Sequence, residues 1–187
     1  MRKSLLAMAL VAGLAAVSAC AEEVEDFDRW YAGAAGGMFL PGNGTSLKRA
    51  GLVAVRGGWY ATEFCAIEAE VLAAPNASSR GGHADIWGGS VQGLFHFAGW
   101  EEFDLLFGCE RFDPFVTCGV QTLCATRHVF ADDSHRTGIG PSVGLGAFYH
   151  LTDRCSLRFD ARAAMAVDSP CGMDYTLTAG LQFGLGD

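Results

Sequence analysis

The chain has 187 residues, of which half are hydrophobic and only 18% are charged, compared with about 25% in an ordinary soluble domain. Its 25 glycines fall largely within apolar segments, where they disfavour the helices of a transmembrane helical bundle. A net charge of −8 argues against a nucleic-acid-binding protein, so no nucleic-acid partner is expected.

The N-terminal segment has the features of an export signal. A basic start is followed by an uncharged run of mostly Leu, Ala and Val at residues 5–19, which is too short to span a bilayer. Cleavage after Ala21 fits the small-residue rule, while the preceding residues also resemble a lipobox and make Cys20 a candidate lipidation residue. We therefore predict a signal peptide at residues 1–21 and an acidic N-terminal stub at residues 22–29.

The rest of the chain alternates apolar residues with small or polar ones at a period of two, which is typical of β-strands. The first four predicted strands are Trp30–Leu40, Leu52–Tyr60, Phe64–Ala74 and Ile86–Phe97. Four more are predicted at Phe115–Cys124, Gly138–Tyr149, Cys155–Val167 and Tyr175–Gly186. Because proline has no amide hydrogen, Pro141 is expected at a β-bulge or at a strand start.

The connections alternate between two kinds. Tight turns are predicted at Ala61–Glu63 and His150–Arg154, and the longer segment Ala98–Asp113 either extends its flanking strands or forms a small cap. Polar loops rich in Gly, Asn, Ser and Asp are predicted at Pro41–Gly51, Pro75–Asp85, Arg127–Arg136 and Asp168–Asp174. An even number of strands of about 9–11 residues, with turns and loops at opposite ends, predicts an eight-stranded antiparallel up-and-down transmembrane β-barrel over residues 30–187.

A soluble barrel of the lipocalin kind also alternates, so the polar face must decide between the two. That face is mostly Gly, Ser, Thr and Ala, with larger polar residues at Arg56, Glu68, Glu70, Gln92, His96, Gln121, Arg158, Asp160 and Arg162. A solvated wall would carry more charge, whereas a narrow lumen is filled by a few large side chains among small ones. Aromatic residues near the strand ends predict an interfacial girdle of Trp30, Tyr31, Trp59, Tyr60, Phe64, Phe95, Phe97, Trp100 and Tyr149.

Three segments resemble small outer-membrane β-barrels of the OmpA/OmpX-like class. Gly138–Asp153 followed by Ser156–Arg162 looks like their sixth strand, periplasmic turn and seventh strand, and Trp30–Phe39 resembles their first strand. The resemblance implies an outer-membrane location, contact with membrane lipid and lipopolysaccharide, and insertion by the barrel assembly machinery. The chain departs from this class in two ways. Such barrels often end on an aromatic residue, whereas Phe183 is followed by Gly-Leu-Gly-Asp187, and no peptidoglycan-binding domain is expected after the last strand.

Six charged residues are predicted to form a lumen charge network, because alternation turns all of them toward the inside: Arg56, Glu68, Glu70, Arg158, Asp160 and Arg162. Three cations and three anions in a confined space should pair with one another, since an unpaired buried charge is strongly destabilising. We interpret the network as a structural plug. The alternative is a gate or a narrow ion path.

An enzyme would need a nucleophile with a base beside it. Ser134-His135 adjoins Asp132-Asp133, and Cys124, His128, Asp132 and His135 offer metal-ligand atoms, but neither set has the spacing of a known site. We therefore expect no enzyme activity, cofactor or metal. Of six cysteines after the predicted signal, those at 65, 118, 124 and 155 fall on the apolar face of non-neighbouring strands, and only a Cys109–Cys118 disulfide is considered.

These features predict a small outer-membrane barrel with a structural, adhesion or surface-recognition role through its four longer loops, which would contact an extracellular partner. The alternative function is a narrow passive pore resembling a porin. A lipid-modifying enzyme of the outer membrane is a third, weaker interpretation.

Overall fold

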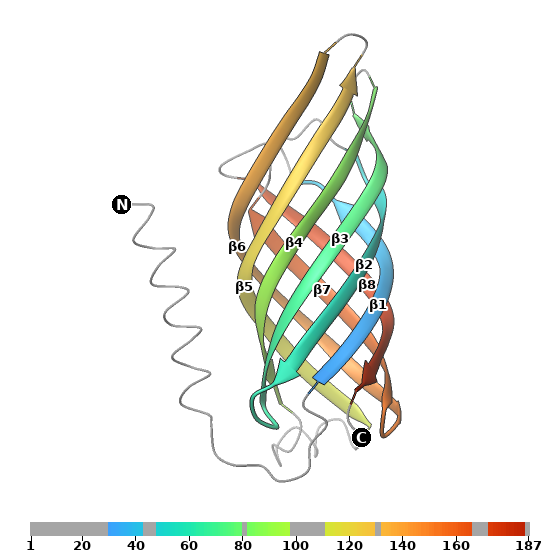
Figure 1. Cartoon of the computed structure of the whole chain (residues 1–187), viewed down its shortest axis with the longest axis vertical. Coiled ribbons are helices and arrows are strands. Elements are labelled where there is room, and N and C mark those ends of the chain that lie inside the picture. Colours follow the sequence, from blue (N-terminus) through green and yellow to red (C-terminus); the bar gives the residue numbers. More distant parts are fainter. Residues whose placement is uncertain are drawn as a thin grey trace, which may run out of the picture.

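The computed structural model describes residues 30–42, 48–79, 82–97, 111–129, 132–165 and 172–185; the predicted signal peptide, the acidic stub and most of the 98–113 connection lie outside them. Eight antiparallel strands pair in chain order and close between the first and the last (Figure 1). The strands are β1 Trp30–Leu40, β2 Ala50–Tyr60, β3 Cys65–Ser79, β4 Gly82–His96, β5 Phe112–Val129, β6 Asp132–Thr152, β7 Cys155–Met165 and β8 Met173–Gly184. No helix within the described residues is long and apolar enough to span a membrane.

The strand register sets the tilt and the width of the barrel. One row of paired residues starts at Leu40 and returns to β1 at Trp30, ten residues lower, after passing through Tyr175, Ala163, Val143, Cys118, Gly93, Ile67 and Trp59. A stagger of this kind over eight strands tilts the strands by about 35–45° and leaves an interior just wide enough for side chains. The predicted fold class is therefore confirmed.

The two ends of the barrel differ in height. The start of β1, the end of β8 and the tight turns after β2 and β6 share one end, here called the terminal end. At the opposite, distal end, β3, β4, β5 and β6 rise above the other strands (Figure 1). They contain 15, 15, 18 and 21 residues, whereas β1, β2, β7 and β8 contain 11 or 12.

Two loop predictions are wrong on the tall side of the barrel, which is formed by β3 to β6. Most of Pro75–Asp85 and Arg127–Arg136 is strand, because the backbone pairing continues to Ser79↔Gly82 in one hairpin and to Val129↔Asp132 in the next. Polar composition indicated loops, but antiparallel strands can be polar where they meet water. Pro141 was also expected at a bulge or strand start, and that prediction is wrong. Pro141 lies inside β6, one residue beyond Ser142, which makes the last pair with β7. Its missing amide hydrogen therefore breaks no ladder with β7.

The outer wall is apolar. Large aliphatic side chains face outward and are exposed around the whole circumference, including Val53, Val55, Val71, Val91, Val143, Leu145, Leu177 and Leu181. Trp30 contacts Trp59 at the terminal end with ring centroids 6.5 Å apart, and Phe64 and Tyr149 are exposed near the same end. Tyr31 differs from the predicted girdle, since it points into the lumen and is only 2% exposed. An apolar belt with aromatic residues at its border is the surface of a transmembrane barrel.

The lumen has three layers. The distal cluster is apolar and consists of Phe39, Ala50, Leu52, Ala54, Leu72, Ala74, Ala84, Ile86, Leu123 and Ala125. The terminal cluster is mainly aromatic and consists of Tyr31, Ala66, Leu94, Phe115 and Phe148, with Tyr60 packed against it. Between them lie buried polar and charged residues of β2 to β8. The polar interior is thus bounded by apolar side chains toward both ends.

Candidate functional site

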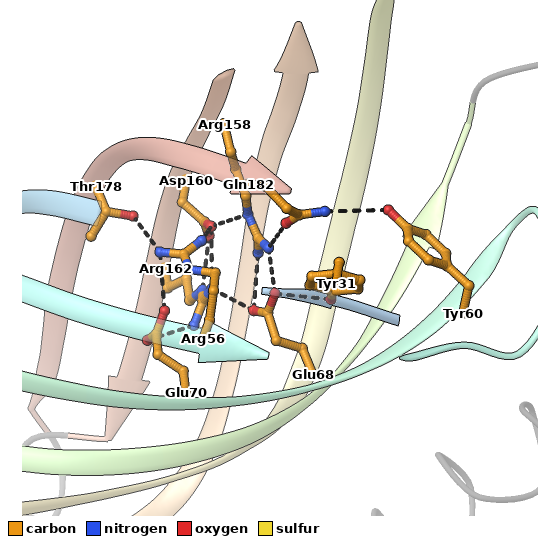
Figure 2. A network of polar contacts seen from close by, with 10 residues as sticks. All are labelled: Tyr31, Arg56, Tyr60, Glu68, Glu70, Arg158, Asp160, Arg162, Thr178 and Gln182. Atoms are coloured by element: carbon orange, nitrogen blue, oxygen red, sulfur yellow. Dashed lines mark hydrogen bonds and ion pairs between the residues drawn. The ribbon is translucent and has the colours of Figure 1, made fainter. Parts of the chain in front are cut away.

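Three strands supply the charge network, which is defined by the same six residues that the sequence indicated. Arg56 lies on β2, Glu68 and Glu70 on β3, and Arg158, Asp160 and Arg162 on β7. Residues two apart on one strand share a face, so each strand turns its charged residues to the lumen together. The side chains of β7 reach those of β2 and β3 across the barrel interior (Figure 2).

Arg158 binds one carboxylate on β3 and one on β7. Its Nη2 donates to Glu68 Oε1 at 3.1 Å, and its Nη1 also contacts the other oxygen of Glu68. Its Nε donates to Asp160 Oδ2 at 2.8 Å, and its Nη1 donates to Gln182 Oε1 at 3.2 Å. The guanidinium carbon lies 4.8 Å from the ring centroid of Phe115 and 5.1 Å from that of Phe148. The guanidinium of Arg158 therefore packs on aromatic rings of the terminal cluster, and the carboxylates of Glu68 and Asp160 balance its charge.

The other two arginines complete the network around the same carboxylates. Arg162 donates to Asp160 Oδ1 at 2.8 Å, to Glu70 Oε1 at 2.9 Å and to Glu68 Oε1 at 3.2 Å. Arg56 donates to Asp160 Oδ2 at 2.6 Å, and its Nη2 lies 3.1 Å from Glu70 Oε2. Three positive and three negative charges thus form one continuous, electrically balanced cluster.

The network is shielded from solvent. Each of its six residues is at most 6% exposed, and Glu68 is fully buried. Buried ion pairs gain strength from the low-dielectric surroundings, but each charge also loses its hydration, so the arrangement depends on every partner being present. The geometry suits a rigid cross-brace between β7 and the β2–β3 pair.

Four residues of this site were missed by sequence reasoning. Tyr31 OH donates to Glu68 Oε2 at 3.0 Å, and Gln182 and Thr178 on β8 accept bonds from Arg158 and Arg56. Tyr60 is the fourth and contacts Gln182 at 3.5 Å. Tyr31 follows the outward-facing Trp30, and Tyr60 follows the outward-facing Trp59, so strict alternation predicts that both tyrosines face the lumen. They were instead assigned to the interfacial girdle because they lie near strand ends.

Glycines make room for the large side chains. A Cβ on Gly144 would lie 2.7 Å from Arg162 Cγ and 2.8 Å from the backbone oxygen of Ala161, and a Cβ on Gly58 would overlap the Tyr31 ring. Both contacts are tighter than real Cβ atoms tolerate. The glycines that first argued against helices therefore have a specific packing role in the lumen.

The histidines of the described side chains make local contacts. His96 Nδ1 lies 2.6 Å from Asp113 Oδ2 and its ring stacks on Phe148 at 5.5 Å, while His150 Nδ1 lies 2.8 Å from Ser156 Oγ. No group of three or more His, Cys, Asp or Glu within the described part of the chain is arranged to hold a metal ion. Of the triad and metal candidates, Cys124 has a described side chain. The others are His128, Asp132, Asp133, Ser134 and His135, whose side chains lie outside the description.

Cys118, Cys124 and Cys155 are free thiols in the described part of the chain, and Cys65 is buried. Cys118 is exposed on the outer wall, while Cys109, its considered disulfide partner, lies outside the described residues, as does Cys20. Cys124 Sγ lies 3.4 Å from Thr137 Oγ1, and the thiols otherwise act as small side chains of the barrel wall.

Comparison with solved structures gives barrels of the same fold. Neisserial surface protein A superposes with a TM-score of 0.66 at 15% identity, covering 83% of this chain and 97% of that one. The N-terminal β-barrel domain of Pseudomonas aeruginosa OprF gives 0.59 at 14% identity, covering 83% and 96%. Ail, the attachment invasion locus protein of Yersinia pestis, gives 0.54 at 11% identity, covering 83% and 98%.

No curated protein sequence matches significantly. The family model for the outer membrane protein beta-barrel domain matches residues 7–186, which is nearly the whole chain. Its match agrees with the closed eight-stranded barrel, the apolar outer wall and the filled polar lumen. This chain belongs to the outer membrane protein beta-barrel domain family and is a protein of the bacterial outer membrane.

Proposed function

We propose that this barrel acts in adhesion or surface recognition, and that the tall distal side formed by β3 to β6 is its contact surface. In outer-membrane barrels the short turns face the periplasm and the opposite end faces the exterior, which places the distal end outside the cell. The charge network then has a structural role, holding the barrel rigid beneath that surface. Membrane lipid and lipopolysaccharide cover the apolar belt, and the barrel assembly machinery inserts the chain.

One observation carries this proposal. The β5–β6 pairing continues to Val129↔Asp132, whereas the last β6–β7 pair is Ser142↔Ala164. Ten residues of β6, Asp132–Pro141, therefore extend for about 33 Å without a ladder to β7. Within the described part of the chain, which leaves out residues 166–171 beyond β7, this edge of β6 has no strand partner. An extended edge with unpaired backbone groups is a surface on which a partner segment adds as a further strand.

Two variants with the same Asn-Gly turn at opposite ends of the barrel test the contact surface. Replacing residues 127–136 by a two-residue Asn-Gly turn shortens the β5–β6 hairpin at the distal end, and replacing Asp153-Arg154 by Asn-Gly is the control at the terminal end. Vesicles carrying each folded variant are assayed for binding to immobilised heparin and extracellular-matrix proteins. Binding by the parent and by the control, with loss in the shortened variant, supports the proposal. Equal binding by all three contradicts it.

A narrow passive pore is the second candidate, and the layered lumen argues against it. An ion crossing the barrel would have to pass the distal cluster and the terminal cluster as well as the balanced charge network. Apolar constrictions of this kind exclude ions by dewetting. A lipid-modifying enzyme is supported even less, because His150 and Ser156 pair without a carboxylate bonded to that histidine among the described contacts.

A further inference from the structure

A second polar feature of the lumen overlaps the charge network and runs across β2 to β5. It is a row of cross-strand neighbours, here called the polar row: Arg56 pairs with Glu70, Glu70 with Ser90, and Ser90 with Gln121. All four side chains are buried, with 4% to 6% of each residue exposed. The row starts inside the charge network and climbs toward the distal end.

Three members of the polar row, Arg56, Ser90 and Gln121, have a buried atom without a hydrogen-bond partner in the protein. These atoms are Arg56 Nε, Ser90 Oγ and Gln121 Nε2, whereas Glu70 Oε2 lies 3.1 Å from Arg56 Nη2 in an ion pair. Two neighbours on the same wall share the property, namely Gln92 Oε1 and Thr117 Oγ1. The orphaned atoms include both donors and acceptors, which is the mixture that a water molecule satisfies with its own two donors and two acceptors.

The position of the row seals it from both sides. On β3, β4 and β5, an apolar residue of the distal cluster lies beyond each polar residue of the row, toward the distal end. These pairs are Leu72 beyond Glu70, Ile86 beyond Ser90 and Leu123 beyond Gln121. On the terminal side, Gln92 Nε2 donates to Ser142 Oγ at 2.7 Å, and Leu94 and Phe115 of the terminal cluster lie beyond. A polar species held at the row is therefore separated from both mouths of the barrel by apolar side chains.

We infer that the polar row is a binding site for a file of buried water molecules, which links the charge network to Gln121. Five dry, unsatisfied polar atoms would together cost a large part of the stability of a typical domain, because each buried polar atom without a partner is penalised. Water removes that penalty, since a buried water commonly makes about three hydrogen bonds to such groups. Ser90 has the smallest side chain of the row and pairs with both Glu70 and Gln121, and the inferred water lies beside it.

The first test detects the water directly. The full mature chain is labelled with ¹⁵N and ¹³C, refolded in detergent micelles, and examined by water-selective NOE and ROE spectroscopy. Long-lived water is expected to give cross-peaks of opposite NOE and ROE sign at the Gln121 side-chain amide and at the Thr117 methyl group, while exchange gives equal signs. The Leu94 methyl groups, packed in the terminal cluster, are the dry control. Absence of cross-peaks at both Gln121 and Thr117 overturns the inference.

The second test uses near-isosteric variants on opposite faces of one strand. Thr117→Val removes an orphaned hydroxyl facing the lumen, and Thr122→Val makes the same change on the lipid-facing side of β5. If Thr117 binds water, its variant lowers the folding equilibrium constant about fivefold, equivalent to one hydrogen bond, and lowers the urea midpoint. Thr122→Val is expected to leave the midpoint unchanged or raised. A raised midpoint for Thr117→Val shows a dry hydroxyl and overturns the inference; if the variant does not fold, the wild-type spectra decide.

Discussion

Replacing Glu68 by glutamine tests whether the charge network is a stabilising brace. Glu68 accepts hydrogen bonds from Arg158, Arg162 and Tyr31, and it is fully buried. The substitution preserves shape but leaves three arginines facing two carboxylates. Breaking a buried ion pair from one side typically costs about 3–5 kcal/mol, because the partner charge stays buried without compensation.

The remaining contacts set where in that range the effect falls. Arg158 keeps Asp160 at 2.8 Å and Gln182 at 3.2 Å, and Arg162 keeps Glu70 at 2.9 Å. We therefore expect the lower end, about 3 kcal/mol of unfolding free energy. Reversible urea unfolding in lipid vesicles, followed by tryptophan fluorescence and by the gel shift between heated and unheated samples, measures it.

Two further variants make the experiment decisive. Glu63→Gln removes the same charge from an exposed turn residue and is expected to change stability by less than about 0.5 kcal/mol. Glu68→Gln combined with Arg158→Met restores the charge balance, so the double variant should be more stable than Glu68→Gln alone. A Glu68→Gln protein as stable as Glu63→Gln would refute the role of the network as a brace.

Three other predictions follow from the lumen and the wall. Planar-bilayer recordings of the purified protein should show negligible conductance, and steady openings that change in Glu68→Gln would contradict a filled lumen. Gly144→Ala should lose about 1–3 kcal/mol in urea titration because its Cβ meets Arg162 and backbone, while Gly51→Ala, with open space at its Cβ, should not be destabilised. Non-reduced tryptic digests should give Cys118 as a free thiol by mass spectrometry, and a Cys118 disulfide would contradict its position on the outer wall.

The sequence alone determined the strands and the two faces of the wall. A period of two is a local property, so the alternation in β8 or β7 assigns each side chain to lumen or lipid without knowledge of its neighbours. The six charged residues of the network were found in this way, because three strands carry charge on the small-residue face. Strand ends were less predictable, since pairing with a neighbour extended β3 to β6 through segments whose polar composition indicated loops.

Only the tertiary structure decided which lumen residues meet. Arg158 and Glu68 are 90 residues apart in sequence, and they contact because closure of the barrel with a stagger of ten brings β7 opposite β3 at that height. The same register placed apolar clusters on both sides of the polar layer, aligned the polar row across four strands, and left one edge of β6 at the distal end without a strand partner among the described residues. These are relations between strands, and hydrophobic alternation within one strand limits the register with the next strand only to steps of two residues.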